Sequence, residues 1–253
     1  MSDDSIVRLG VDNPFAGGLI SASSVLDASR YPARRAVDWK TATYWKAATG
    51  GSEQYLRSED VTGSGPYNYC AAARHNLGGS MLVFQVRTPG GAWQDAVQFF
   101  APEGPFFVSF DEISGADAQL LIINQDEPAQ IGVFAAGVAT EFPEGCRPPI
   151  APGRLNPDDE MIGGVTEGGE INGASLLRTG GMESLTFDLL DPDWIRDVWH
   201  PVRQQLRYQG AFVAWNYENY SADVIYGWLA KARAQHSSSF FMDLDLDFRG
   251  VIE

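Results

Sequence analysis

The chain has 253 residues, and 33 Asp and Glu against 18 Lys and Arg give it a formal net charge of −15. This charge disfavours stable binding to nucleic acid or to an anionic membrane surface, because both need cations on the protein. A hydrophobic content of 44% is typical of a folded chain with two domains or one large one, and no apolar run is long enough to span a membrane. The two cysteines, Cys70 and Cys146, lack the spacing of a disulfide-rich or zinc-binding fold.

Residues 1–17 predict an N-terminal arm, and residues 18–142 predict an all-β domain. In the second range, short apolar or alternating runs are separated by Gly, Pro and Asn turns. Many short strands with frequent turns favour a β-sandwich or barrel over alternating strands and helices. The expected strands are 67–73, 81–87, 97–100, 106–110, 119–123 and 131–138.

A proline-rich segment at residues 143–157 separates the two halves of the chain. It contains five of the 14 prolines. Proline fixes φ and disfavours helix at the preceding residue, so we expect an extended linker here. Residues 1–150 hold 17 acids and 10 bases and the remainder hold 16 and 8, so bulk charge does not distinguish the halves.

Residues 158–253 predict a second β domain that carries one helix, over residues 192–208. Asp191 is suited to cap this helix, and Pro192 to occupy its first position. Apolar side chains follow at helical spacing, and Pro201 within them is expected to kink or divide the helix. The expected strands are 183–189, 211–216, 224–229 and 239–251.

The last expected strand carries Asp243, Asp245 and Asp247 at alternate positions. The spacing imitates the start of a calcium-binding loop, but Phe248 stands where such a loop needs glycine. Strict alternation therefore predicts a strand with three aspartates on one face and apolar side chains on the other. This face is either a solvated polar surface or an acidic stripe with a function of its own.

The sequence offers no motif for catalysis. It contains no nucleophile elbow, zinc-protease motif or P-loop, and no dinucleotide fingerprint in its strand-to-helix context. His75 and His200 have structural explanations, and nothing selects a pair of carboxylates for glycoside hydrolysis, which depends on their separation in space. We therefore expect no enzyme activity, no metal site and no cofactor.

The first half resembles the discoidin-like (coagulation factor type C) domains. The motifs that carry this resemblance are Ile20–Ser23, Tyr31–Ala33 and Ala36–Trp45, followed in order by Tyr69–Leu77 and Phe84–Trp93. The resemblance implies a galactose-binding-like jelly roll over residues 18–142, with Trp45 in its core. Lys40 stands in a loop that contributes to a calcium site in many relatives, and a lysine there disfavours calcium.

Nearly the whole chain resembles the tail-tip proteins of long-tailed bacteriophages, in which a discoidin-like module often precedes a tail-tube-like domain. The motifs in the second half are Gly180–Phe187, Asp191–Trp194, Gln209–Asn216, Asp223–Trp228 and Met242–Gly250. The resemblance implies a distal-tail-like structural protein with a tail-tube-like β-barrel or sandwich as its second domain. Distal-tail proteins often place that domain first, whereas here it would be second.

The same resemblance implies a ring of about six copies that joins the tail tube to the hub, surrounds the DNA channel and belongs to the virion tail tip. The protein would be made in the host cytoplasm, and DNA would pass through the ring without stable binding. An acidic channel wall would repel phosphate, so we expect Asp243, Asp245 and Asp247 to face the channel.

A carbohydrate-binding module of a virion or cell surface, used for host attachment, is the alternative. In that interpretation a host glycan is the partner, and Trp39, Arg74 and His75 are candidate sugar-binding residues in loops of the jelly roll. A ring seen by light scattering or electron microscopy favours the structural function. A stable monomer that binds glycan favours the alternative.

Overall fold

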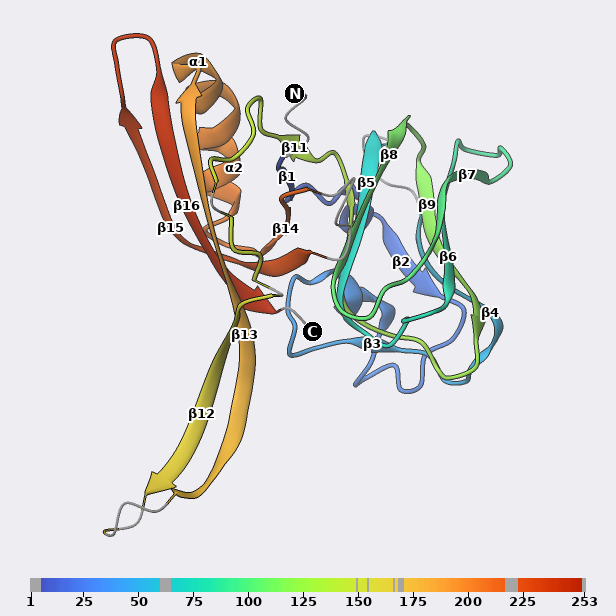
Figure 1. Cartoon of the computed structure of the whole chain (residues 1–253). Helices are drawn as coiled ribbons and strands as arrows, with labels where there is room; N and C mark the ends of the chain where they lie inside the picture. The colour runs from blue at the N-terminus through green and yellow to red at the C-terminus, as the bar shows by residue number, and fades with distance from the viewer. Residues whose placement is uncertain are drawn as a thin grey trace.

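In a computed structural model of the chain, residues 6–59, 65–148, 150–153, 155–165, 167, 171–216 and 223–251 are described. Parts of the expected N-terminal arm and of the proline-rich linker therefore lie outside the described residues. Over the described residues the fold is mainly β, as predicted, and the paired strands of its sheets are antiparallel (Figure 1). A β-sandwich forms the first half, and a seven-stranded sheet with a helix against one face forms the second.

Two sheets pack face to face in the sandwich. The five-stranded sheet contains β2 (Leu19–Ala22), β4 (Gly51–Glu59), β9 (Asp117–Gln125), β6 (Met81–Arg87) and β7 (Gln94–Phe100), in that order. The four-stranded sheet contains β3 (Trp45–Lys46), β10 (Gln130–Gly137), β5 (Tyr67–His75) and β8 (Phe106–Ile113).

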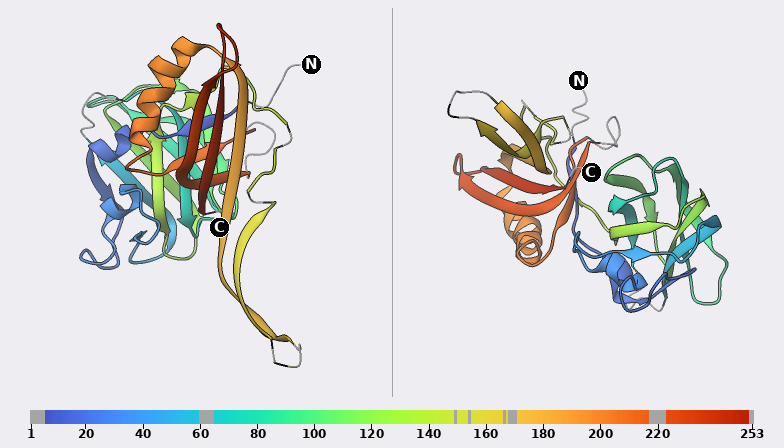
Figure 2. Two further views of the ribbon diagram at one scale, coloured as in Figure 1. Left: turned by 90° about the vertical axis from the view of Figure 1, so that its left-hand side faces the viewer. Right: turned by 90° about the horizontal axis from the view of Figure 1, so that it is seen from below.

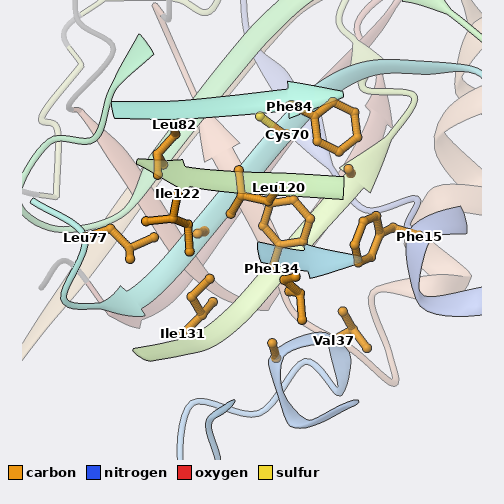
Figure 3. Close-up of a cluster of buried hydrophobic side chains, with 14 of the residues drawn as sticks. Phe15, Val37, Cys70, Leu77, Leu82, Phe84, Leu120, Ile122, Ile131 and Phe134 are labelled. Carbon is orange, nitrogen blue, oxygen red and sulfur yellow. The ribbon is translucent and has the colours of Figure 1, made fainter. Parts of the chain in front are cut away.

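Apolar side chains from alternate positions of both sheets form the core of the sandwich, part of which Figure 3 shows. Trp45 is fully buried in this core, as expected, and its indole N–H donates to the carbonyl of Ser24 over 3.1 Å. A short 3-10 helix, η1 (Pro14–Gly17), adds Phe15, whose ring meets Phe134 edge-on. A second one, η2 (Ala33–Val37), packs against β10.

The seven-stranded sheet joins segments from both ends of the chain. Its order is β11 (Thr140–Glu141), β1 (Arg8–Gly10), β14 (Ala211–Ala214), β15 (Val224–His236), β16 (Met242–Val251), β13 (Ile171–Leu190) and β12 (Pro157–Val165). The N-terminal strand β1 pairs with β14, so the segment expected as an arm contributes a central strand to the sheet of the second half.

The seven-stranded sheet has apolar side chains on both faces where it meets the sandwich. Phe212 and Ala214 of β14 pack against the outer side of the four-stranded sheet, including Tyr69 and Phe107. The intervening Val213 of β14 points to the other face, into a core covered by the helix. The two halves are therefore joined through a buried apolar contact, and Figure 2 shows them lying side by side.

The helix of the second half occupies nearly the predicted range. It runs through α1 (Pro192–Trp194), a π-helical turn η3 (Ile195–Trp199) and α2 (His200–Gln205). Asp191 caps it as expected, accepting the backbone N–H of Asp193 over 2.8 Å. The wide turn lies immediately before Pro201, and such turns accommodate a break in the regular hydrogen-bond ladder.

A long hairpin, formed by β12 and the first part of β13, projects away from the rest of the molecule (Figures 1 and 2). Strand β13 is 20 residues long; its residues 181–190 pair with β16, whereas residues 171–180 pair, in the described part of the chain, with β12 alone. The strand expected at 183–189 is therefore the inner part of a much longer one. Ile162 and Leu176 lie on the projecting part with their side chains exposed.

Candidate functional site

The most structured loop at the junction of the halves follows η2 and contains Trp39. Trp39 has a positive φ of 61°, which is uncommon for a residue with a bulky side chain. Asp38 holds the loop by accepting the backbone N–H of Lys40 and the hydroxyl of Thr43, both over 2.9 Å. This loop of the sandwich therefore has a defined shape, and it places Trp39 beside the second half.

Trp39 contacts strand β15 through the side chain of Tyr226. The two rings stack with 6.4 Å between centroids and 12° between planes, and the Tyr226 hydroxyl donates to the Trp39 carbonyl over 2.6 Å. Burial raises the pKa of the Tyr226 phenol above its ordinary value, and the charge of Asp38 raises it further. The phenol therefore stays protonated at neutral pH and remains a hydrogen-bond donor.

Three hollows in the described part of the chain are lined by Trp39, and we call the two that also contain Trp228 the junction groove. One has a volume of about 340 Å³ and is lined by Trp39, Lys40, Thr41, Ala42, Gly210, Tyr226, Gly227, Trp228, Gly250 and Val251. The other has a volume of about 380 Å³ and adds Asp38, Leu206, Arg207, Tyr208, Gln209 and Leu229. Both volumes fall in the range of small-molecule sites.

Glycines keep part of the groove wall free of side chains. Gly227 of β15 and Gly250 of β16 are directly paired, and a Cβ on either would overlap the backbone of the other strand. A Cβ on Gly210 would lie only 2.5 Å from the Tyr226 hydroxyl oxygen. Residues larger than glycine at these positions would displace the strands or the tyrosine that shape the groove.

Exposed aromatic rings and polar groups border the groove. Trp228 is 55% exposed and Tyr208 is 89% exposed, although both are large aromatic residues. Lys40, Arg207 and Gln209 line the same hollow and supply hydrogen-bond donors. Flat aromatic faces beside hydrogen-bonding groups suit a ligand that is apolar on one side and polar on the other.

The structure places only one of the three sugar-binding candidates in this groove. Trp39 lines it, but Arg74 and His75 lie at the end of β5, and in the described residues no hydrogen bond or ring contact joins either of them to Trp39. His75 Nδ1 accepts the backbone N–H of Leu77 over 3.2 Å, and burial lowers the pKa of its imidazole to about 4. A sugar-binding role for Arg74 and His75 stays a prediction.

The three aspartates of β16 alternate with buried apolar side chains as the sequence predicts. Asp245 and Asp247 accept hydrogen bonds from Thr186 and Ser184 of β13, over 3.1 and 2.7 Å. On the other side Arg233 of β15 is paired in register with Asp245, and Lys231 Nζ lies 3.8 Å from Asp247. Neighbouring strands thus offset the repulsion among these carboxylates within one chain.

Asp243 accepts the backbone N–H of Leu189 over 3.3 Å. The exposure of these aspartates to a DNA channel is a property of an assembly and stays a prediction. Across the described ranges, no three His, Cys, Asp or Glu side chains gather closely enough to hold a metal ion. The helices within those ranges are too short and polar to cross a membrane.

Trp228 and Tyr208, which border the groove, are not among the candidate residues predicted from the sequence. Trp228 could have been found, because alternation over 224–229 places it on the face opposite to Ile225. Tyr208 follows the helix in a turn, and its position at the groove depends on how the helix packs on the sheet. That packing is a property of the whole fold.

No protein-family model matches this chain, and no curated protein matches it significantly. Over about half of its length the chain is similar to solved structures of carbohydrate-binding modules. Chitosan-binding module 1 of a Paenibacillus sp. IK-5 chitosanase/glucanase is 17% identical, with a TM-score of 0.44, and the match covers 50% of this chain and 99% of the module. A Clostridium perfringens module (CpGH89CBM32-5), solved with GalNAc-β-1,3-galactose, is 14% identical, with a TM-score of 0.44 and coverage of 49% and 98%.

A Ruminococcus gnavus GH29 fucosidase, solved with fucose, is 12% identical with a TM-score of 0.45, and the match covers 51% of this chain and 27% of the enzyme. The matches span nearly the whole length of the two modules and about a quarter of the fucosidase. At these identities and TM-scores the likeness carries no argument about what this chain binds, which depends on its own side chains.

Proposed function

We propose that the chain is a non-enzymatic carbohydrate-binding protein and that the junction groove is its glycan site. The observation that carries the proposal is the exposure of Trp228 and Tyr208 at the rim of the same hollow. A sugar ring has an apolar C–H face, which stacks on an aromatic ring, and hydroxyl groups, which need hydrogen-bond partners. Lys40, Arg207 and Gln209 provide such partners within the groove.

The wall of the groove is fixed before a ligand arrives. Trp39 is held by stacking and by the Tyr226 hydrogen bond, and the glycine pair of β15 and β16 keeps the floor open. A site that is already formed loses less conformational entropy on binding. The groove is therefore suited to a short glycan whose ring packs on Trp228.

A glycan array followed by calorimetry with the best ligand tests this proposal. Trp228→Ala is expected to weaken binding at least about tenfold, because a stacked aromatic anchor is removed. Phe100→Ala is the control, since Phe100 is an even more exposed aromatic residue on β7, outside the groove. Absence of glycan binding by the folded protein, or equal affinity of both variants, would contradict the proposal.

A second candidate function is assembly into an oligomer, favoured by the projecting hairpin of β12 and β13. A two-stranded hairpin is at best marginally stable in water on its own, and this one exposes Ile162 and Leu176. Strand β12 also forms an edge of the seven-stranded sheet, and edge strands pair readily with other chains. Contact with another copy would cover both features.

In this second function the chain is a ring-forming subunit of a bacteriophage tail tip, between tail tube and hub, and it resides in the virion. The ring would surround the DNA channel, and Asp243, Asp245 and Asp247 would face it. The resemblance of the second-half motifs to tail-tip proteins supports the proposal together with the hairpin. Electron microscopy of the purified protein tests it through the presence of rings.

The double variant Ile162→Ser with Leu176→Ser is expected to abolish rings and to leave the folded subunit intact, because both side chains are already exposed. Leu19→Ser is the control, since Leu19 is similarly exposed but lies on β2 of the sandwich. A protein that remains monomeric at all concentrations in native mass spectrometry would argue against assembly without its tail partners.

A further inference from the structure

Cations gather around the junction groove of a strongly acidic protein. The larger hollow is lined by Lys40 and Arg207, and a smaller hollow of about 170 Å³, which shares Arg207 with it, adds Arg203 and Lys231. Asp38 is the one acid among the residues that line the groove and this smaller hollow, and Asp12 lines a further hollow that shares Trp39 and Gln209 with the groove. The chain as a whole has 33 acids against 18 bases, so its local balance of charge is reversed here.

These cations are available to a ligand. Lys40, Arg203 and Arg207 are exposed, and none of them forms an ion pair within the part of the chain that the structure describes. Asp38 already accepts two hydrogen bonds from its own loop. A positive potential therefore persists over the groove, where a nearby low-dielectric wall strengthens it.

Strand β15 presents unpaired backbone groups along the junction groove. It pairs with β14 only as far as Gly227, and from Trp228 onward that edge has no strand partner in the described residues. An unpaired edge presents N–H and C=O groups to whatever occupies the groove. These groups suit the hydroxyls of a sugar, and the guanidinium of Arg207 suits a carboxylate.

We propose that the ligand of the junction groove is an acidic glycan, whose sugar ring stacks on Trp228 and whose carboxylate is bound by Arg207 and Lys40. This inference rests on the proposed function and names its substrate class. Charge complementarity selects the ligand: a neutral sugar would leave the exposed cations without partners, and a cationic sugar would be repelled by them.

A glycan array that presents acidic glycans beside their neutral counterparts tests the inference and separates it from the proposed function. Binding of acidic glycans without binding of their neutral counterparts supports both the acidic assignment and the proposed function. Neutral hits alone overturn the acidic assignment and leave the proposed function standing. An array without any hit for the folded protein overturns both.

Trigalacturonic acid and its methyl ester provide a matched pair for calorimetry, since the ester has the same sugar rings but replaces each carboxylate charge with a neutral methyl ester. The acid is expected to bind at least about tenfold more tightly than the ester, because its charge-assisted bonds are stronger. Its affinity should fall between about 0.05 and about 0.3 M salt, where screening shortens the range of the attraction. Equal affinities for acid and ester would overturn the inference.

Arg207→Gln is expected to weaken binding of the acid about tenfold and binding of the ester much less, because glutamine still offers a hydrogen-bond donor and only the positive charge is lost. Trp228→Ala should weaken binding of both the acid and the ester. Arg147→Gln is the control, since Arg147 is an exposed arginine near Asp188 and outside the groove. Unchanged binding of the acid by Arg207→Gln would overturn the inference.

Discussion

The hydroxyl of Tyr226 donates a hydrogen bond of 2.6 Å to the backbone carbonyl of Trp39, across 187 positions of sequence. Trp39 belongs to a loop of the sandwich, and Tyr226 to a central strand of the seven-stranded sheet. The same pair of residues links the two halves and forms the wall of the candidate glycan site. Changes at this contact should therefore affect stability and binding together.

Tyr226→Phe removes the hydroxyl that bonds to Trp39 and keeps the ring. We expect the free energy of unfolding to fall by about 1 kcal/mol, the usual contribution of one such hydrogen bond. Urea unfolding followed by circular dichroism measures the change. Tyr208→Phe is the control, because the side chain of Tyr208 is 89% exposed and its loss of a hydroxyl should cost nothing measurable. Equal midpoints for the two variants would contradict the assigned contact.

Gly250→Ala would drive a methyl group into the backbone of Tyr226 on the neighbouring strand. We expect the free energy of unfolding to fall by about 2 kcal/mol or more, because the strands must separate locally to make room. Thermal unfolding measures the loss. Gly17→Ala is the control, since a Cβ there would meet no atom within 4 Å. Similar melting temperatures for both variants would show that the strands adapt without cost.

Glu183 gives the protein a pH-dependent stability. Its side chain is 1% exposed, and desolvation raises the pKa of the carboxyl to about 8; the charge of Asp223 adds to this rise, and the backbone N–H of Gly153 opposes it. Between the ordinary pKa of 4.5 and about 8, the folded protein holds a proton that the unfolded chain has released. The stabilising effect of neutral Glu183 is therefore present below pH 4.5 and is lost as pH rises toward 8.

Within that window the free energy of unfolding should fall by at most about 1.4 kcal/mol per pH unit from this group. Glu183→Gln keeps the shape and removes the titration, so the difference in stability between the variant and the parent should grow from pH 5 to pH 8 in favour of the variant. Chemical unfolding at several pH values measures it. A difference that does not change with pH would show that Glu183 is ionised in the folded protein.

Gln119 anchors a row of polar side chains across the outer face of the five-stranded sheet. It accepts from Arg57 Nε over 2.9 Å and donates to Gln85 over 2.6 Å. Gln119→Ala should lower the free energy of unfolding by about 1–3 kcal/mol, because two partly buried partners lose their bonds. Gln98→Ala, an exposed position on β7, is the control. A double-mutant cycle with Gln85→Ala should show coupling, and additive effects would contradict the network.

Much of the sandwich could be predicted from the sequence, because most of its strands are short apolar runs bounded by turn residues, whereas β4 has few apolar residues and was not predicted. The expected strand 81–87 coincides with β6, and 106–110 lies inside β8. The burial of Trp45 was also predicted. In each case the signal is local: apolar side chains at every second position, bounded by glycine or proline.

The second half of the fold and the junction groove depend on contacts between segments that are distant in the sequence. Strand β12 and the outer part of β13 contain glycines and charges without apolar alternation, so nothing local predicts them. The pairing of β1 with β14 is invisible in the sequence, and the junction groove exists only because of such pairings. Trp39 was identified as a candidate from its loop, whereas the role of its neighbour Tyr226 follows from the fold alone.

The position of β1 has a consequence for the order in which this protein is made. The ribosome synthesises Leu9 well before its partner Val213, because all strands of the sandwich lie between them in the sequence. The sandwich strands can pair with one another during this interval, while the surface around Phe107 still lacks the strand that covers it. The nascent chain therefore passes through a stage in which this apolar surface is exposed, and its exposure to aggregation depends on how quickly the residues up to β14 are translated.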